Sequence, residues 1–265
     1  MLQIPLRPGL QGGRWACLRP LCGHDEAFVH GTGAVEAMTL LDRLLIAAPG
    51  TTVGPGKAKE LAVCDCDRLC AAIYLHYFGE RIASTLICQE CNTPFELSFS
   101  LRDLVASLED GVATKATGPD EEGLYTLLDG RRFRLPTIGE QHSVMGLEAE
   151  TAVVTLLKRC VVAGDPMAAS ELIQDAMHEV GAVLDLDLDA ICPACAAPHP
   201  VRFGIQTYLL RALAYEKRFL NREIHSIAMA YGWGYEEILN LTREDRRTFV
   251  RLIESDQATW KRGRA

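Results

Sequence analysis

The amino-acid sequence predicts an α+β fold that is mainly helical, with a small antiparallel zinc-ribbon-like β element and a further β-hairpin. A CxxC pair occurs twice, in ICQECNTPFELSF (87–99) and in ICPACAAPHPVRF (191–203), and the two segments match at a constant offset of 104 residues. Alternating apolar residues, which are typical of strands, flank both pairs. Apolar residues at helical spacing cover much of the remaining chain.

The first 80 residues are expected to contain a strand and several helices. Residues 15–18 are apolar and stop shortly before a proline, which predicts a strand. Apolar residues at helical spacing predict a helix over 35–47. A further helix has Asp65 or Asp67 as a suitable N-terminal cap and Gly79 at its end.

A β-hairpin is predicted in the middle of the chain, because Asp129-Gly130 lies between two alternating segments and favours a two-residue turn. Thr137 is suited to cap the helical region that follows. The elements expected in this part are strands at 82–87 and 95–99, a helix at 101–108, a polar mobile loop at 109–123, hairpin strands at 125–128 and 132–135, and helices at 149–162 and 168–183.

The last part of the chain combines the second CxxC pair with the longest predicted helix, over 206–231. Residues 184–189 alternate leucine with aspartate, which predicts a strand with one acidic face, and two short helices are expected after Gly232. We expect both CxxC hairpins to join into one folding unit. The predicted regions are an N-terminal strand and helices (1–80), the first CxxC hairpin (81–108), a hairpin and helical insertion (109–183), and the second CxxC hairpin with the C-terminal helices (184–265).

The two CxxC pairs predict one metal site with Cys88, Cys91, Cys192 and Cys195 as its ligands. In a zinc ribbon each CxxC closes a tight turn between strands, and two such turns place four thiolates around one tetrahedral zinc ion. Three alternatives remain open: buried reduced cysteines, a duplication that has lost its metal, and thiol–disulfide catalysis. Catalysis is disfavoured because a redox CxxC normally opens a helix.

Residues next to the pairs qualify this prediction. Asn92 and Ala196 stand where such turns often have glycine, and alanine adopts the left-handed conformation poorly. His199 is close enough in sequence to donate a hydrogen bond to a cysteine, but the flanking Pro198 and Pro200 favour a plain loop. Two looser groups of potential ligands are better interpreted as structural residues; these are Cys64, Cys66 and Cys70, and Cys17, Cys22 and His24.

Charge and hydropathy restrict the partners. The net charge of −8 argues against general nucleic-acid binding, which needs a positive surface. The apolar stretches are too short to cross a membrane, and no signal-peptide core is visible, so we expect a cytoplasmic protein without membrane insertion. A basic run near the C-terminus is expected to form a solvated face or to dock on an acidic partner; its residues are Arg246, Arg247, Arg251, Lys261, Arg262 and Arg264.

Several segments spread over nearly the whole chain carry a resemblance to a known family. They include LRPLCGHDE (18–26), CDRLCAAIYLHYFGERI (66–82), both CxxC segments, FRLPT (133–137) and EIHSIAMAYGWGYEEILNLTREDRRTFVRLI (223–253). They resemble the zinc-knuckle-bearing baseplate proteins of contractile phage tails and phage-tail-like contractile injection systems, which are related to T4-type baseplate hub proteins. In this sequence IGEQH follows FRLPT, where the family more often has a short acidic helix start.

The resemblance implies a structural or assembly component of a baseplate that binds other baseplate, tube or hub proteins and is not an enzyme. No pattern of a catalytic site appears in the sequence, which agrees with that implication. Such a protein is expected to be made in the cytoplasm and assembled into a particle. The alternatives are a baseplate assembly chaperone that is absent from the finished particle, and a zinc-ribbon nucleic-acid-binding protein that uses the basic C-terminus.

Overall fold

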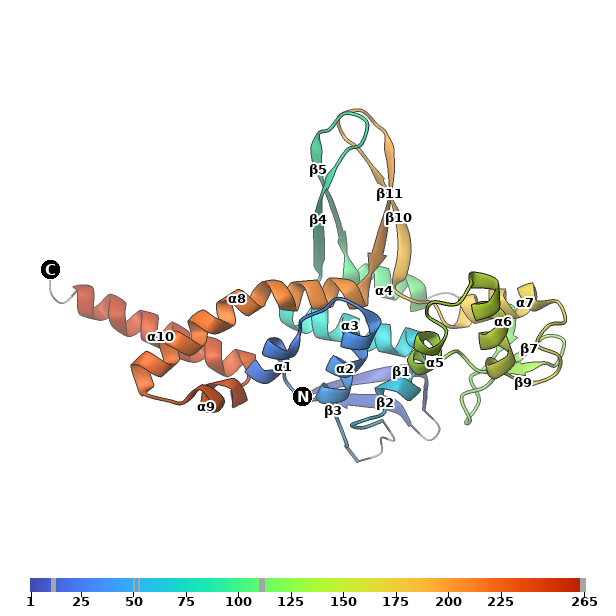
Figure 1. Ribbon diagram of the computed structural model, residues 1–265, viewed down its shortest axis with the longest axis horizontal. Helices are drawn as coiled ribbons and strands as arrows, with labels where there is room; N and C mark the ends of the chain where they lie inside the picture. Colours follow the sequence, from blue (N-terminus) through green and yellow to red (C-terminus); the bar gives the residue numbers. More distant parts are fainter. Residues whose placement is uncertain (11–12, 50, 52, 110–112, 263–265) are drawn as a thin grey trace.

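The fold is α+β, as the sequence predicts. A computed structural model describes residues 1–10, 13–49, 51, 53–109 and 113–262. Within these residues the strands form small antiparallel sheets of two to four strands, and helices make up most of the body. Figure 1 shows that two hairpins project from the body side by side. We call this projection, made of β4, β5, β10 and β11, the finger.

Most predicted elements are present, but the strands at 2–10, 45–46, 116–117 and 161–163 were not predicted, and the last helix is long. The helices are α1 (Gly23–Phe28), α2 (Ala34–Leu44), α3 (Val63–Phe78), α4 (Leu101–Glu109), α5 (Ile138–Ser143), α6 (Ala149–Cys160), α7 (Ser170–Val180), α8 (Ile205–Tyr231), α9 (Tyr235–Asn240) and α10 (Arg243–Arg262), with a 3₁₀ turn at Ala58–Glu60. The strands are β1 (Leu2–Leu10), β2 (Gly13–Leu18), β3 (Leu45–Ile46), β4 (Arg81–Ile87), β5 (Pro94–Ser100), β6 (Ala116–Thr117), β7 (Tyr125–Leu127), β8 (Arg132–Phe133), β9 (Val161–Ala163), β10 (Asp185–Ile191) and β11 (Pro198–Gly204).

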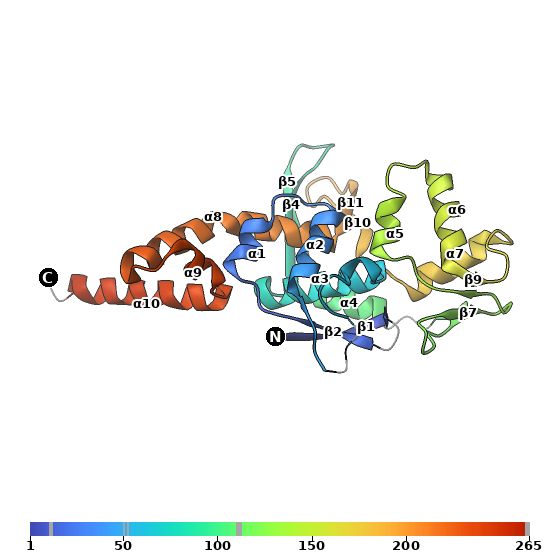
Figure 2. The ribbon, with the colours of Figure 1, turned by 60° about the horizontal axis from the view of Figure 1, so that its bottom comes forward.

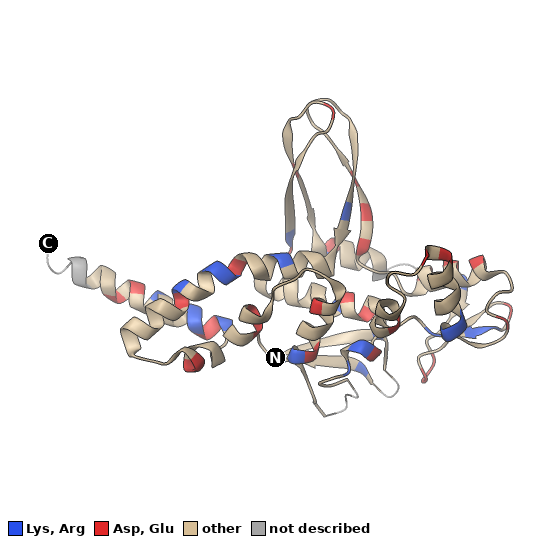
Figure 3. Ribbon diagram, in the orientation of Figure 1, with Lys and Arg blue, Asp and Glu red and all other residues tan. Residues whose placement is uncertain are grey.

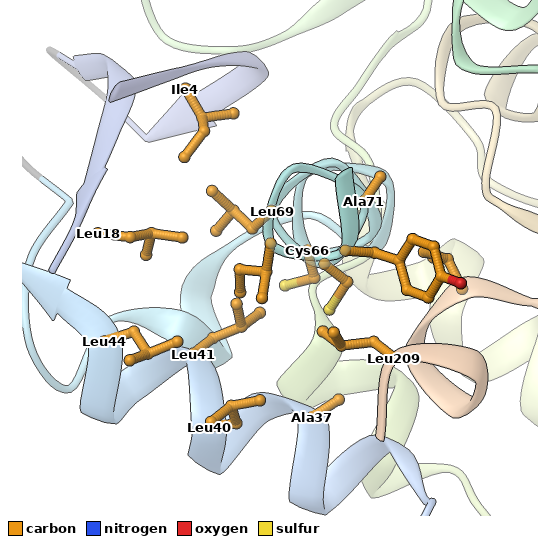
Figure 4. Close-up of a cluster of buried hydrophobic side chains, with 14 of the residues drawn as sticks. Ile4, Leu18, Ala37, Leu40, Leu41, Leu44, Cys66, Leu69, Ala71 and Leu209 are labelled. Carbon is orange, nitrogen blue, oxygen red and sulfur yellow. The ribbon is translucent and has the colours of Figure 1, made fainter. Parts of the chain in front are cut away.

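Helix α3 lies at the centre of the largest hydrophobic core. Its Cys66 and Leu69 are fully buried among leucines of α2 and α8, including Leu41 and Leu209 (Figure 4). Cys64 and Cys70 are buried as well, which confirms their structural interpretation. Because α3 ends just before β4 and α8 begins just after β11, this core holds the bases of both finger hairpins.

Two buried aspartates of α3 connect it to other segments. The expected capping role of Asp65 or Asp67 is wrong, since the helix begins at Val63. Asp65 instead accepts backbone hydrogen bonds from Arg7 at 2.5 Å and Gly9 at 2.7 Å. Asp67 accepts from the Leu184 backbone and from Gln206 Nε2, both at 2.8 Å. Asp67 therefore ties α3 to both ends of the second finger hairpin.

Helices α8, α9 and α10 form an arm that leaves one end of the body (Figures 1 and 2). At its root, Glu26 of α1 pairs with Arg243 and Arg246 of α10, and Glu223 of α8 pairs with Arg246 and Arg247. Arg246 has no exposed side-chain area. The prediction of a solvated basic face is therefore wrong for Arg246. A buried charge requires such partners, because removing one typically costs several kcal/mol.

Part of the predicted basic run lies outside the described residues, namely the side chains of Lys261 and Arg262 and all of Arg264. Among the described residues, no helix is both long and apolar enough to cross a membrane.

A small lobe at the opposite end contains α6, α7 and a four-stranded sheet (Figure 2), whereas Ile138 of α5 packs in the largest core. The predicted hairpin is part of this sheet, but its turn is longer than two residues. Leu127 donates to Arg131 O, which leaves Leu128, Asp129 and Gly130 as the connection. Gly130 has a positive φ of 89°, as the longer turn requires. Residues 110–112 of the predicted mobile loop lie outside the described residues, and β6 follows them.

The buried face of the hairpin was not predicted, whereas the N-terminal cap of α5 was. Tyr125 and Phe133 of the hairpin are fully buried in the core of the lobe. Thr137 caps α5, and its side chain accepts from the Glu140 backbone, as predicted.

Replacing Asp67 with asparagine should stabilise the protein at neutral pH. Burial raises the pKa of Asp67 to about 6, although hydrogen bonds from Gln206 and Leu184 oppose this rise. The folded pKa exceeds the unfolded value of about 3.9, so wild-type stability falls as pH rises through about 6. We expect Asp67→Asn to raise the free energy of unfolding by roughly 2 kcal/mol at pH 7.5, with no gain at pH 4.

Urea unfolding of both proteins at several pH values measures this difference. The exposed Asp256 of α10 provides a matched control, because Asp256→Asn should change stability little at any pH. A difference between wild type and Asp67→Asn that does not vary with pH would contradict the prediction.

Candidate metal centre at the tip of the finger

The two finger hairpins have the same register. Seven residue pairs join β4 to β5 and seven join β10 to β11. The last pair before the turn is Ile87–Pro94 in the first hairpin and Ile191–Pro198 in the second. Every pair of the second hairpin lies 104 residues after its counterpart, so the offset seen in the sequence is also a structural offset.

Both CxxC turns take the same backbone conformation without glycine. The Asn92 N–H donates to Cys88 O at 2.9 Å, and the Ala196 N–H donates to Cys192 O at 2.8 Å. Asn92 and Ala196 have φ values of 55° and 59°, in the left-handed region. Asparagine tolerates this region, whereas alanine pays a steric penalty for its Cβ. The missing glycines therefore leave the turn geometry intact but place strain at Ala196.

The turns bring the four predicted ligands together. The Sγ atoms of Cys88, Cys91, Cys192 and Cys195 all lie within 4.8 Å of one another. Across the hairpins, Cys88 Sγ lies 3.5 Å from Cys195 Sγ, and Cys91 Sγ lies 3.7 Å from Cys192 Sγ. Zn–S bonds near 2.3 Å in a tetrahedron place sulfurs about 3.8 Å apart. The cysteines are thus close enough to hold a metal ion, and the spacing fits zinc.

Equivalent aromatic residues of the two hairpins also face each other. The Phe99 and Phe203 rings are 5.1 Å apart and meet edge to face, and the Phe95 and His199 rings are 5.6 Å apart. Each pair joins residues 104 positions apart, as expected near a two-fold axis. The thiol contacts obey the same relation, since each joins the first cysteine of one pair to the second cysteine of the other.

The two exposed thiols of the cluster differ in acidity. The side chain and backbone of Thr93 and the thiol of Cys88 lower the pKa of Cys91 to about 6. The Ala197 backbone N–H also donates to Cys195, but contacts with Cys88 and Cys91 outweigh it and raise the pKa of Cys195 to about 12. Four thiolates this close repel one another, so a divalent cation is the natural means of ionising all of them together.

Burial also divides the thiols. Cys88 and Cys192 are each 1% exposed and pack with Phe95 and Ala190, whereas Cys91 and Cys195 are exposed. Each turn thus supplies one buried and one exposed sulfur. The paired turn geometry and the apolar packing fix the positions of these sulfurs.

Contrary to the sequence prediction, His199 does not lie in a plain loop. It lies in β11 and pairs with Ala190, and its Nε2 is 3.2 Å from Cys88 Sγ. The plain-loop interpretation is therefore incorrect, because prolines are tolerated at the edge of a two-stranded sheet. The offset of 104 residues offered a signal, since it aligns His199 with the inward-facing Phe95.

The other potential ligands are not brought together. Within the described ranges, the finger cysteines are the one group of three or more His, Cys, Asp or Glu residues with metal-binding spacing. Cys22 is the N-cap residue of α1, and its Sγ lies 3.2 Å from Asp25 Oδ2. His24 Nε2 lies 3.4 Å from Glu236, and Cys17 is buried in β2.

No protein-family model, curated protein or solved structure matches this chain. The site is therefore interpreted from its own geometry and from the sequence resemblance.

Glycine at position 196 should stabilise the finger. Ala196→Gly removes a Cβ from a left-handed residue, and we expect the free energy of unfolding to rise by about 1 kcal/mol. Asn92→Gly should have a smaller effect, since asparagine tolerates this conformation. Thermal and urea unfolding measure both changes.

The exposed Ala214 of α8 is the matched control. Ala214→Gly makes the same chemical change inside a helix and should destabilise the protein by about 1 kcal/mol. If glycine destabilises at both position 196 and position 214, strain at Ala196 is not the explanation.

Proposed function

We propose that the finger cysteines bind one structural zinc ion that clamps the two hairpins together. The observation that supports this proposal most strongly is the group of four sulfurs within 4.8 Å, contributed equally by both turns. Four thiolate ligands complete a tetrahedral zinc site and leave no open position for a substrate water. The ion would act on folding, because its ligands meet only when both hairpins are correctly placed.

A redox role has less support. Catalytic CxxC thiols usually lie at a helix N-terminus, whose dipole lowers the thiol pKa. Here each pair lies in a turn between two strands. The closest thiol contacts also run between the hairpins and not within a CxxC pair.

Loss of one buried ligand should remove both metal and stability. We expect wild-type protein, purified without added zinc, to contain about one zinc per chain by elemental analysis. Cys88→Ser and Cys192→Ser should lose the zinc, and their free energy of unfolding should fall by several kcal/mol.

The buried Cys160 of α6 lies outside the cluster and provides a control. Cys160→Ser should keep its zinc whatever its effect on packing. A metal-free wild-type protein with the same stability as Cys88→Ser would disprove the zinc clamp.

We further propose that the protein is a structural or assembly component of the baseplate of a contractile phage tail or contractile injection system. The sequence resemblance suggests this role, and the shape of the finger supports a role in protein contacts. Ile87 and Ile191, which flank the thiol cluster, are each 65% exposed. Figure 3 shows charged residues near the base of the finger and few toward its tip. Two exposed isoleucines near the end of a projection are suited to contact a partner, although the first turn also carries the exposed Glu90.

Two alternatives make different predictions. An assembly chaperone would be needed for particle formation but absent from finished particles. A nucleic-acid-binding protein would use the basic C-terminus, yet Arg246 and Arg247 are paired with glutamates of α1 and α8. The net charge of −8 also disfavours binding to a polyanion, so baseplate assembly is the better proposal.

Deleting the gene in a particle-producing host should reduce the yield of assembled particles, and complementation should restore it. Mass spectrometry of purified particles should find the protein together with tube or baseplate proteins. The variant Ile87→Glu/Ile191→Glu should remain folded but lower its incorporation at least tenfold, because charge at these two apolar positions opposes their burial in an interface.

Ser98→Glu on the exposed face of β5 is the control and should be incorporated normally. A requirement for assembly without incorporation would support the chaperone. A protein that is neither incorporated nor needed for assembly has no baseplate role.

A further inference from the structure

The two-fold relation of the finger is broken at one place beside the thiols. The inward-facing position after the turn is Phe95 in the first hairpin and His199 in the second, and these rings face each other at 5.6 Å. His199 Nε2 reaches Cys88 Sγ at 3.2 Å. Phe95 belongs to the same buried cluster but has no polar atom to offer Cys192. The site therefore has a polar neighbour on one side only.

We propose that His199 is a positioning residue of this metal site, whose Nε2–H donates a hydrogen bond to the Cys88 thiolate. The inference rests on the proposed metal clamp. A metal-bound thiolate has lone pairs and no proton, so the imidazole nitrogen that faces it must be the donor. Nε2 therefore carries a proton when the metal is bound.

The hydrogen bond would stabilise the negative charge of the buried Cys88 thiolate. Four thiolates and one divalent cation carry a net charge of −2, and Asp189 lies in the adjacent strand. Cys88 is 1% exposed, so water has little access to its sulfur. A protein donor replaces that missing solvation. Cys91 and Cys195 are exposed and can be solvated directly. Of the two buried sulfurs, only Cys88 has an imidazole donor among the described residues.

An exchange of the two aromatic residues tests the role of the donor. Replacing His199 with phenylalanine makes the two hairpins alike, and we expect Co²⁺ affinity to fall 10- to 100-fold. The double variant Phe95→His/His199→Phe keeps the composition and moves the donor to the Cys192 side. It should recover affinity to within a few-fold of wild type, since the two-fold relation places position 95 opposite Cys192.

The full-length proteins are titrated with Co²⁺ against a competing chelator, and the thiolate-to-cobalt charge-transfer band is recorded. We expect this band to shift in His199→Phe and to return toward its wild-type position in the double variant. Unchanged affinity and spectrum in His199→Phe would overturn the proposal. Equal losses in the single and double variants would also overturn it, because packing would then explain them. Wild-type protein that binds neither Co²⁺ nor Zn²⁺ would instead refute the metal clamp itself.

Discussion

The architecture depends on the contact between two hairpins whose equivalent residues are 104 positions apart in the sequence. A two-stranded hairpin is marginally stable alone in water. In the finger, each hairpin buries its inner face against the other, through the thiol cluster at the tip and the Phe99–Phe203 contact nearer the base. The bases continue into α3 and α8, which share the largest core. The contact between hairpins therefore couples distant parts of the chain.

The segment between the hairpins shows why such a distant contact is feasible. It contains α5 and the whole lobe of α6 and α7, yet the entropy of closing a loop grows only with the logarithm of its length, by about 0.6 kcal/mol per doubling. A cross-link over about 100 residues can stabilise a fold by more than 4 kcal/mol in the chain-entropy model. A metal clamp at the tip would act in the same way, and its benefit would reach the central core through α3 and α8.

The sequence was sufficient for the features that depend on local pattern. The helical periodicity over 206–231 predicted α8, and the repeated CxxC segments predicted both hairpins and the four clustered cysteines. The features that were missed depend on tertiary contacts. Aspartate is a common helix-capping residue, but Asp65 and Asp67 accept hydrogen bonds from residues far along the chain. Arginine is usually exposed, but Arg246 is buried and pairs with Glu26 and Glu223. No local pattern contains those partners.

Some features of the finger are shared by both hairpins, and others are found in only one of them. Turn geometry, strand register and the phenylalanine pair near the base are shared by both hairpins, so they are the minimum needed to place four sulfurs around one point. The outer faces differ: β10 has Asp185, Asp187 and Asp189, whereas β4 has Arg81, Ala83 and Thr85 in the equivalent positions. The exposed isoleucines at the tip are the same on both sides. A partner bound at the exposed isoleucines would contact the same residue type on both hairpins, whereas a partner bound to the outer faces would meet a different charge on each hairpin. Arg202 of β11 pairs with Asp185 and Asp187, so Asp189 is the aspartate of this outer face that lies outside these ion pairs, and the two hairpins still differ in charge.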